Sequence, residues 1–385
     1  MRFSVDAHAI GCHLTGNEVY IRNLLNAFAA TDDEAEFIAY LSVPEAAELV
    51  PHCFSQRRVS RNPFVRLGFD LPRRVRRDKP DLLHVQYTAP INCPVPVVVS
   101  VHDVSFLEHP EYFTPSRATQ LRLTVRRTVA RAARIITGSE FSRSAITRAY
   151  GVNGDKIVVV PDAAASEFQP TSREAAVAWV RSHFRIHSPF ILTVGDLQPR
   201  KNQVGLIHAF AGMLRACPEL PHCLVLAGKE NWRGSEVRRA AEESGLGDRI
   251  HFTGFVHDGS LLHLYNACDF FVFPSFYEGF GLPVIEAMAC ARAVACSNTS
   301  AVHEVADGAA VLFDPHSTTE MTGAMLDLVR HPELRQRMER VGLQRSAQFN
   351  WRKTAERTLE VYYDVAASRS GLRRERLAPV PVSDP

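Results

Sequence analysis

Two glutamates eight positions apart, Glu278 and Glu286, flank a Gly-Phe-Gly-Leu-Pro turn that follows an apolar run at 270–273. An apolar run followed by glycine and then proline is typical of a strand that leads through a tight loop into a helix. The free N–H groups and positive dipole of such a helix start attract a phosphate. Both carboxylates could accept hydrogen bonds from paired sugar or ribose hydroxyls. The segment therefore predicts a site for a phosphorylated sugar.

Adjacent cationic side chains, Arg200 and Lys201, follow an apolar strand expected at 190–194. Arginine offers planar paired donors and lysine a compact charge, so the pair can bracket a diphosphate from two sides. Such a pair would replace the divalent cation of many nucleotide-sugar enzymes, and the chain contains no D-x-D motif. We therefore expect no metal. The alternative for this pair alone is a solvated loop with ordinary surface charge.

Three further segments are weaker candidates. His102 follows a strand expected at 95–100, so it should stand at the floor of a cleft, where it could donate to a sugar hydroxyl or support the phosphate. A lone loop histidine is more often structural. Gly16, between the first strand and a helix, would let the loop approach a phosphate. Gly254, Phe255 and Val256 end a strand and could offer backbone atoms to a nucleobase, or form a simple turn.

Length and composition point to a soluble two-domain protein. The chain has 385 residues, 46% of them hydrophobic and 22% charged, which suits two domains of ordinary composition. The net charge of +2 favours neither nucleic acid nor an acidic partner. The eight cysteines never form C-x-x-C, so buried reduced thiols are expected rather than a zinc site or disulfides. With neither a signal-peptide pattern nor a membrane-length apolar run, a cytoplasmic location is expected.

Basic charge is concentrated in two runs of the first half. The segment 57–79 holds nine basic and two acidic residues, and 116–134 holds six arginines and no acid. Basic helices bind anionic lipid surfaces with about 1 kcal/mol per charge. A peripheral contact with the inner face of a membrane is one interpretation, and a solvated helix face is the other.

Short apolar runs alternate with helical patterns along the whole chain, which predicts parallel sheets flanked by helices. The expected strands are 2–6, 36–41, 82–86, 95–100, 134–137, 156–160, 190–194, 222–227, 250–253, 270–273, 293–296 and 310–313. The expected helices are 19–29, 116–133, 203–215, 235–244, 261–267, 283–289 and 318–329. Two doubly wound α/β domains would face a central cleft, with ligands at the carboxyl ends of the strands. We expect domains at 1–170 and 171–350, a helix at 351–365 that crosses back to the first domain, and a disordered tail at 366–385.

These features together resemble the retaining glycosyltransferases of family four, which have the GT-B fold. The likeness covers about residues 2–363, and its most specific mark is E-x₇-E at Glu278 and Glu286. Supporting segments are Val-Gly-Asp-Leu-Gln-Pro-Arg-Lys-Asn (194–202), Val-His-Asp-Val (101–104), Gly-Ser-Glu-Phe-Ser-Arg (138–143), Thr-Ser-Ala-Val-His-Glu-Val (299–305) and Leu-Phe-Asp-Pro (312–315). Two positions depart from the family pattern: Asp162 and Ala163 replace an Asn-Gly pair, and His303 replaces a common proline. The stretch 101–113 is similar to bacterial mannosyltransferases of surface polysaccharide synthesis.

The resemblance implies a role for each candidate residue. Glu278 would bind donor sugar hydroxyls, Glu286 the ribose hydroxyls, and His102 the transferred sugar. Arg200 and Lys201 would hold the diphosphate. The other residues expected at the donor are Gly16, Gly254, Phe255, Val256, Gly279, Phe280, Gly281 and Leu282.

The expected function is transfer of a hexose, mannose in our interpretation, from a nucleotide diphosphate sugar to a hydroxyl of a glycan or lipid-linked acceptor, with retention of configuration. We expect GDP-mannose as donor, with a UDP-hexose left open, and no cofactor. The alternatives are a GT-B sugar-nucleotide epimerase and a catalytically silent sugar-nucleotide binding protein. Incubation with donor but no acceptor separates them, because only the epimerase would release an epimerised nucleotide sugar. A nucleic-acid partner is not expected.

Overall fold

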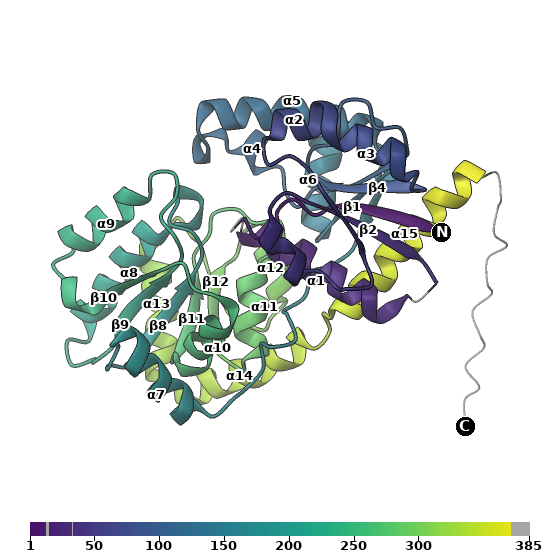
Figure 1. Ribbon diagram of the computed structural model, residues 1–385. Helices are drawn as coiled ribbons and strands as arrows, with labels where there is room; N and C mark the ends of the chain where they lie inside the picture. Colours follow the sequence, from purple (N-terminus) through teal and green to yellow (C-terminus); the bar gives the residue numbers. More distant parts are fainter. Residues whose placement is uncertain (13–14, 33, 371–385) are drawn as a thin grey trace, which may run out of the picture.

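The computed structural model describes residues 1–12, 15–32 and 34–370. Within these residues the strands form two parallel sheets, one of seven strands in the order β3-β2-β1-β4-β5-β6-β7 and one of six in the order β10-β9-β8-β11-β12-β13 (Figure 1). The expectation of two doubly wound α/β units is thereby confirmed. Among the described residues, no helix combines the length and the apolar character that crossing a membrane requires.

The first sheet and its helices occupy the purple and blue part of the chain (Figure 1). Its strands are β1 (Arg2–Asp6), β2 (Glu36–Leu41), β3 (Ser55–Arg58), β4 (Leu82–Gln86), β5 (Val97–Ser100), β6 (Arg134–Thr137) and β7 (Ile157–Val159). Its α-helices are α1 (Thr15–Thr31), α2 (Pro63–Val65), α3 (Leu71–Asp78), α4 (Ser105–Glu108), α5 (Pro115–Arg131) and α6 (Glu140–Tyr150). Shorter turns are η1 (Pro44–Leu49), η2 (Arg66–Asp70), η3 (Pro110–Tyr112) and η4 (Gly154–Lys156).

The second sheet repeats this alternation. Its strands are β8 (Phe190–Val194), β9 (Cys223–Ala227), β10 (Ile250–Gly254), β11 (Phe270–Phe273), β12 (Val294–Ser297) and β13 (Val311–Phe313). Its helices are α7 (Arg173–Phe184), α8 (Gln203–Ala216), α9 (Gly234–Glu243), α10 (Asp258–Ala267), α11 (Leu282–Ala289), α12 (Ser300–Ala306), α13 (Thr318–Arg330) and α14 (Pro332–Ser346), with short turns η5 (Pro199–Lys201) and η6 (Gly247–Arg249).

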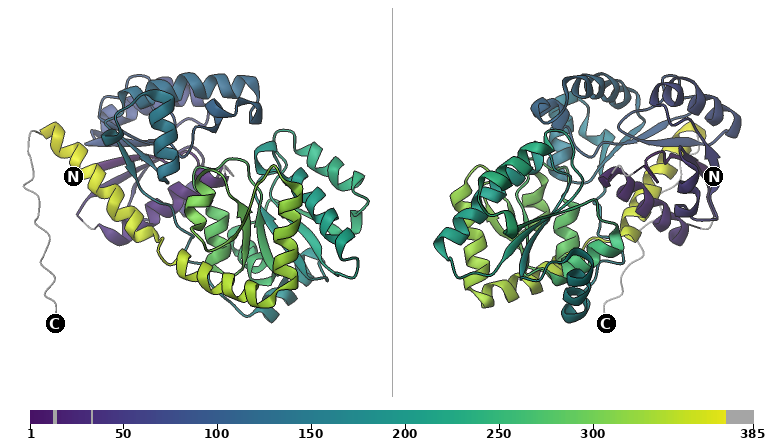
Figure 2. Two further views of the ribbon diagram at one scale, coloured as in Figure 1. Left: turned by 180° about the vertical axis from the view of Figure 1, so that it is seen from behind. Right: turned by 60° about the vertical axis from the view of Figure 1, so that its left-hand side comes forward.

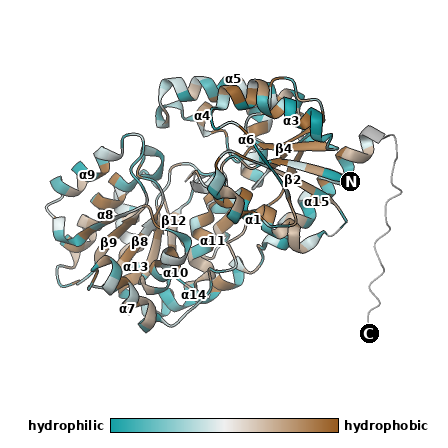
Figure 3. Cartoon of the chain, viewed as in Figure 1, coloured by the Kyte–Doolittle hydropathy of each residue, from teal (hydrophilic) through white to brown (hydrophobic). Residues whose placement is uncertain are grey.

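Each sheet is covered by helices on both faces, and the strands are mostly hydrophobic in character (Figure 3). In the first unit, α1 packs on one face, and α3, α5 and α6 pack on the other. In the second unit, α8, α9 and α13 cover one face, and α7, α10, α11 and α12 cover the other. This double coverage explains why most residues of the central strands are apolar, since a parallel sheet with two covered faces has no solvated side.

The last helix, α15 (Trp351–Ser370), lies against the first unit rather than the second (Figures 1 and 2). Its Tyr362 is fully buried beside Phe3, and the Thr354 hydroxyl donates to the carbonyl of Pro161 at 2.7 Å. The helix runs five residues past its expected end at 365. The expected tail from 371 onward, and Leu14 before Gly16, lie outside the described residues.

Every expected strand is present, and none of their ends differs from the expected position by more than two residues. Strand β3 was not expected, because its residues Ser-Gln-Arg-Arg are polar and carry no apolar period. β3 exists because it pairs along the edge of the sheet with β2, where solvated side chains are tolerated. The helices that were also not expected are α2, α3, α4, α6, α7, α12 and α14. Helix α6 does carry local signals of a helix: Ser139 caps its start, and Gly151 follows its end in a left-handed conformation.

Candidate active site

The structure brings Glu278, Arg200 and Lys201 into direct contact. Strands β8 and β11 are hydrogen-bonded neighbours, so the loops at their carboxyl ends meet. The Arg200 guanidinium donates to Oε2 of Glu278 at 2.6 Å, and the Lys201 ammonium donates to Oε1 at 2.6 Å. The three side chains are only 15%, 12% and 10% exposed for arginine, lysine and glutamate, respectively. Three charged side chains thus form one largely desolvated cluster at the carboxyl ends of the central strands of the second sheet.

The ionisation of this cluster follows from its geometry. Burial alone would raise the pKa of Glu278, but the positive charges of Arg200 and Lys201 lower it to about 2. Burial alone would lower the pKa of Arg200, yet Glu278 and the first-domain carboxylate Asp103 raise it. For Lys201, burial and the neighbouring guanidinium lower the pKa despite Glu278. With both basic groups charged, the cluster has one more positive than negative charge and can attract an anion.

Glu286 lies beside this cluster in sequence but has a different partner. It sits one turn into α11, is 6% exposed, and accepts a 2.9 Å hydrogen bond from the hydroxyl of Tyr265. Burial raises its pKa to about 7, against the opposing effect of that hydrogen bond. Glu286 was expected from the sequence but Tyr265 was not, because a tyrosine inside the apolar pattern of α10 resembles a core residue.

The loop between the two glutamates touches the first unit. A Cβ atom at Gly279 would lie 2.0 Å from the carbonyl oxygen of His102, so only glycine fits there. The hydroxyls of Ser139 and Ser142 donate to the carbonyl of Gly279 at 2.7 and 3.0 Å. The predicted loop therefore lies where both units meet.

The following residues lead into α11. Phe280 is buried, and Gly281 has φ of +110°, in the region that favours glycine. Leu282 is the first helical residue, so its N–H has no partner within the helix. The predicted N–H groups are therefore positioned at a helix start, as the sequence pattern indicated.

His102 stands on the opposite side of the junction. Its Nε2 donates to the side-chain oxygen of Gln86 at 3.0 Å, and the Gln86 amide donates to the carbonyl of Asn17 at 3.1 Å. Burial lowers the pKa of His102 to about 4, although Asp103 opposes this shift. The ring is therefore neutral at neutral pH, with its proton on Nε2 and Nδ1 left as an acceptor. Gln86 was missed because it ends an apolar strand with no motif around it.

Gly16 and the 254–256 turn occupy more distant positions. Gly16 is the second residue of α1 rather than a loop residue, and it is exposed next to Asn17.

Gly254 ends β10 with φ of +70° and accepts a hydrogen bond from the N–H of Gly228. Strand β10 is two strands from β8, about 10 Å away. Phe255, which is 41% exposed, and Val256 belong to the turn after β10. This turn lies at the same end of the sheet as Arg200, but two strands away from it.

Metal ligands do not gather in the described part of the chain: no group of three or more His, Cys, Asp or Glu side chains there is arranged to hold an ion.

Comparison with known proteins gives two family matches that together span most of the chain. Residues 14–164 match the family described as Glycosyltransferase Family 4, and residues 181–345 match Glycosyl transferases group 1. The O-antigen chain mannosyltransferase B of Escherichia coli is 31% identical over 265 residues, which cover 69% of each chain. The serotype-specific mannosyltransferase WbdA of the same organism is 33% identical over 228 residues, 58% of this chain but only 28% of that protein.

Among solved structures, sucrose-phosphate synthase from Thermosynechococcus elongatus superposes with a TM-score of 0.77 at 19% identity, covering 95% of this chain and 99% of that one. At this identity the likeness concerns the fold. Together with the two parallel sheets, it establishes the GT-B architecture.

Proposed function

Because this chain belongs to the family-four glycosyltransferases, with their GT-B fold, we propose that it transfers mannose from a nucleotide diphosphate sugar to a hydroxyl of a growing polysaccharide. The observation that carries the proposal is the contact of Glu278 with both Arg200 and Lys201 at 2.6 Å. Mannose is favoured by the names of the two Escherichia coli relatives. GDP-mannose is the proposed donor, and a UDP-hexose is the alternative.

In this proposal the cationic pair and the start of α11 bind the diphosphate. Negative charge grows on the diphosphate as the sugar–oxygen bond breaks, and groups that stabilise this charge accelerate the reaction. Arg200 and Lys201 are fixed in place by Glu278, so they need little reorganisation when the donor enters. The unpaired N–H of Leu282 adds a helix-terminal donor.

The glutamates have separate roles. Glu278 is held ionised by two cations, which makes it a weak base and suits it to accept hydrogen bonds from donor sugar hydroxyls. Glu286, with its pKa raised to about 7, is proposed to bind the ribose hydroxyls, for which either protonation state offers hydrogen bonds. Neutral His102 is proposed to accept a hydrogen bond from the transferred sugar through Nδ1.

Retention of the anomeric configuration is part of the proposal. Glu278 is already engaged by two cations, so it is poorly suited to attack the sugar as a nucleophile. A front-face reaction, in which the departing diphosphate oxygen takes the acceptor proton, needs no protein base. This agrees with a site rich in cations and with a neutral His102 of low pKa.

A panel of nucleotide sugars tests the proposal. Thermal unfolding should shift upward with GDP-mannose more than with UDP-hexoses, because a ligand that binds only the folded state stabilises it. Transfer to a mannose-containing oligosaccharide should then be followed by NMR, where a product of the same anomeric configuration as the donor supports retention. Release of an epimerised nucleotide sugar without an acceptor would instead identify an epimerase. Absence of any shift with every nucleotide sugar would overturn the proposed donor class.

A further inference from the structure

Large apolar side chains are strongly exposed on one surface of the first unit. Among the described residues, the five most exposed large hydrophobic side chains are Phe64 at 80%, Phe69 and Leu123 at 66%, Ile91 at 53% and Val65 at 48%. Single exposed apolar residues are ordinary on protein surfaces, but a cluster of them marks an interaction site.

Hydrogen bonds join the segments that carry these exposed residues: the loop with Ile91 is tied to η2 on one side and to α5 on the other. The N–H of Ile91 donates to the carbonyl of Leu67 in η2 at 3.1 Å, and the Arg127 guanidinium of α5 donates to the carbonyl of Ile91. The N–H of Ala89 donates to the Thr128 hydroxyl at 2.9 Å. Figures 1 and 2 show α2, α3 and α5 together on one side of the first unit, at the top of the view in Figure 1. We call α2, η2, α3, the loop 88–96 and α5 the outer face.

Arginines surround the apolar residues. In α5 the side chains of Leu121, Val125 and Val129 are buried, so the helical period of 100° per residue turns Leu123 outward. The neighbouring positions on the same side are arginines at 122, 126, 127 and 131, and α5 contains no acidic residue. The outward side of this helix is thus cationic with an apolar centre.

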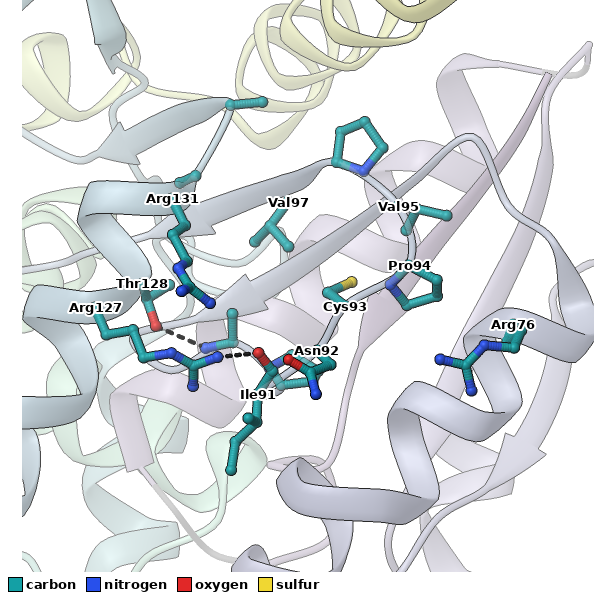
Figure 4. A pocket seen from close by; sticks show the side chains of 15 residues that line it. Arg76, Ile91, Asn92, Cys93, Pro94, Val95, Val97, Arg127, Thr128 and Arg131 are labelled. Carbon is teal, nitrogen blue, oxygen red and sulfur yellow. Dashed lines mark hydrogen bonds between the residues drawn. The ribbon is translucent and has the colours of Figure 1, made fainter.

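Two hollows flank α5, and each is lined by three arginines. One, of about 580 Å³, has Arg76 of α3 facing Arg127 and Arg131 of α5 across the loop 88–96 (Figure 4). The other, of about 830 Å³, is lined by Arg122 and Arg126 of α5 and by Arg148 of the adjoining α6, which pairs with Glu108 at 3.4 Å and leaves the two α5 arginines as its available cations. The overall charge of the chain is only +2, so this positive charge is local. Arginine forms paired hydrogen bonds with phosphate, which makes such hollows suitable for phosphate groups.

We propose that the outer face docks on the anionic lipid surface of a membrane. Phe64, Phe69, Ile91 and Leu123 enter the boundary between headgroups and acyl chains, and the arginines of the two hollows bind lipid phosphates. Aromatic and aliphatic side chains beside basic residues are the combination that binds anionic lipid interfaces. A soluble polyanion would use the arginines but would leave the apolar side chains in water, so the lipid surface accounts for both features.

The position of the outer face relates it to the proposed reaction. The loop 88–96 begins directly after Tyr87, whose ring lies 5.6 Å from the ring of His102. Docking would therefore bring the first-unit side of the site close to a lipid-linked acceptor. This consequence rests on the proposed function, whereas lipid binding by the outer face does not.

Vesicle co-sedimentation of the full chain tests the inference. The protein should sediment with vesicles of phosphatidylcholine and phosphatidylglycerol, but not with phosphatidylcholine alone, and added salt should weaken binding. The double variant Arg122→Glu/Arg126→Glu, and separately Phe64→Ser/Phe69→Ser, should each reduce partitioning by about tenfold or more. These four side chains are exposed, so the variants should fold.

Matched control variants carry the same chemical changes on surfaces outside the outer face. Arg337→Glu/Arg340→Glu makes the same charge change on exposed positions of α14, and Trp232→Ser removes an exposed apolar side chain of the second unit. Both should sediment like the wild type. All variants should keep the thermal shift with GDP-mannose. A wild type that shows no such shift would contradict the proposed donor, whereas the vesicle experiment would still test lipid binding by itself. Wild-type protein that ignores anionic vesicles would overturn the inference. A second outcome would also overturn it. If size-exclusion chromatography showed a dimer of the wild type that the outer-face variants lose, while these variants still bound vesicles, the outer face would join two copies of this chain.

Discussion

Glu304 and Phe141 are joined across the boundary between the two units, where the backbone N–H of Phe141 donates to the Glu304 carboxylate at 2.9 Å. The same carboxylate accepts the N–H of Glu140, also at 2.9 Å. These N–H groups lie at the start of α6 and have no partner within that helix. Glu304 of α12 therefore caps a helix of the other unit. The cap lies beside the contact of Gly279 with Ser139, and therefore close to the proposed donor site.

We predict that Glu304→Ala weakens the contact between the two units. Loss of a capping carboxylate costs about 1 kcal/mol. We expect donor binding to draw the two units together, so donor affinity should fall about fivefold. Calorimetric titration with the donor measures this, and small-angle scattering should show a more open particle. Glu230→Ala, an exposed glutamate of the second unit, is the control. Unchanged affinity and particle size would remove Glu304 from domain closure.

Lys201→Ala should lower turnover strongly while the protein stays folded. Loss of one group that stabilises developing charge costs about 3 kcal/mol, or a hundredfold or more in rate. Glu278 keeps its bond to Arg200, so the pocket should not collapse. Single-turnover kinetics with the donor and circular dichroism measure the two effects. Lys353→Ala, at an exposed position of α15, should match the wild type. Near-normal turnover of folded Lys201→Ala would exclude Lys201 from the site.

Gln86→Leu should lower turnover through His102. The amide oxygen of Gln86 keeps the His102 proton on Nε2, and its amide also bonds to Asn17. Without Gln86 either ring nitrogen can carry the proton, which should reduce turnover by about tenfold, the effect of one lost hydrogen bond. Gln86→Glu retains an acceptor for Nε2 and should recover part of the activity. Turnover of Gln86→Leu equal to that of the wild type would show that the tautomer of His102 does not matter.

Chelation of divalent cations should leave turnover unchanged. Arg200 and Lys201 supply the positive charge that a cation would otherwise bring to the diphosphate. The measurement compares initial rates with EDTA and with added magnesium. A rate that falls with EDTA and returns with magnesium would contradict the prediction.

The central part of this fold could be read from the sequence because its strands are buried on both faces. Continuous apolar runs such as 270–273 have few alternatives, whereas the polar edge strand β3 exists only because β2 offers it hydrogen bonds. The same difference applies to the site. Glu278, Arg200 and Lys201 stand directly after such strands, so their proximity followed from strand order.

Residues that complete the site through tertiary contacts could not be found in this way. Gln86, Tyr265 and Ser139 reach their partners from elements far away in sequence, at separations between 16 and 140 residues. Their local sequence shows only a strand end, an apolar helix face and a helix cap. The segment 299–305 supported the family resemblance, but the role of its Glu304 as a cap for α6 was not predicted, because it depends on how the two units face each other.

Glu286→Gln should change how stability depends on pH. The pKa of Glu286 is raised from 4.5 to about 7, so its favourable contribution is complete below pH 4.5 and is lost as pH rises through 7. Above pH 7 the buried charge destabilises the fold by on the order of 3 kcal/mol. Glutamine can still accept the hydrogen bond from Tyr265 but does not ionise. Urea unfolding from pH 5 to pH 8 should therefore show a flatter profile for the variant.

The control for this experiment is Asp162→Asn, because burial also raises the pKa of Asp162 to about 7. Each variant should remove part of the wild-type loss of stability, and the double variant should remove more than either one. Glu278 acts in a different window: its pKa is lowered to about 2, so its contribution is complete above pH 4.5 and disappears only as pH falls through 2. A stability profile of Glu286→Gln parallel to the wild type between pH 5 and pH 8 would mean that Glu286 is not buried with a raised pKa, and its proposed place beside the ribose would lose its electrostatic basis.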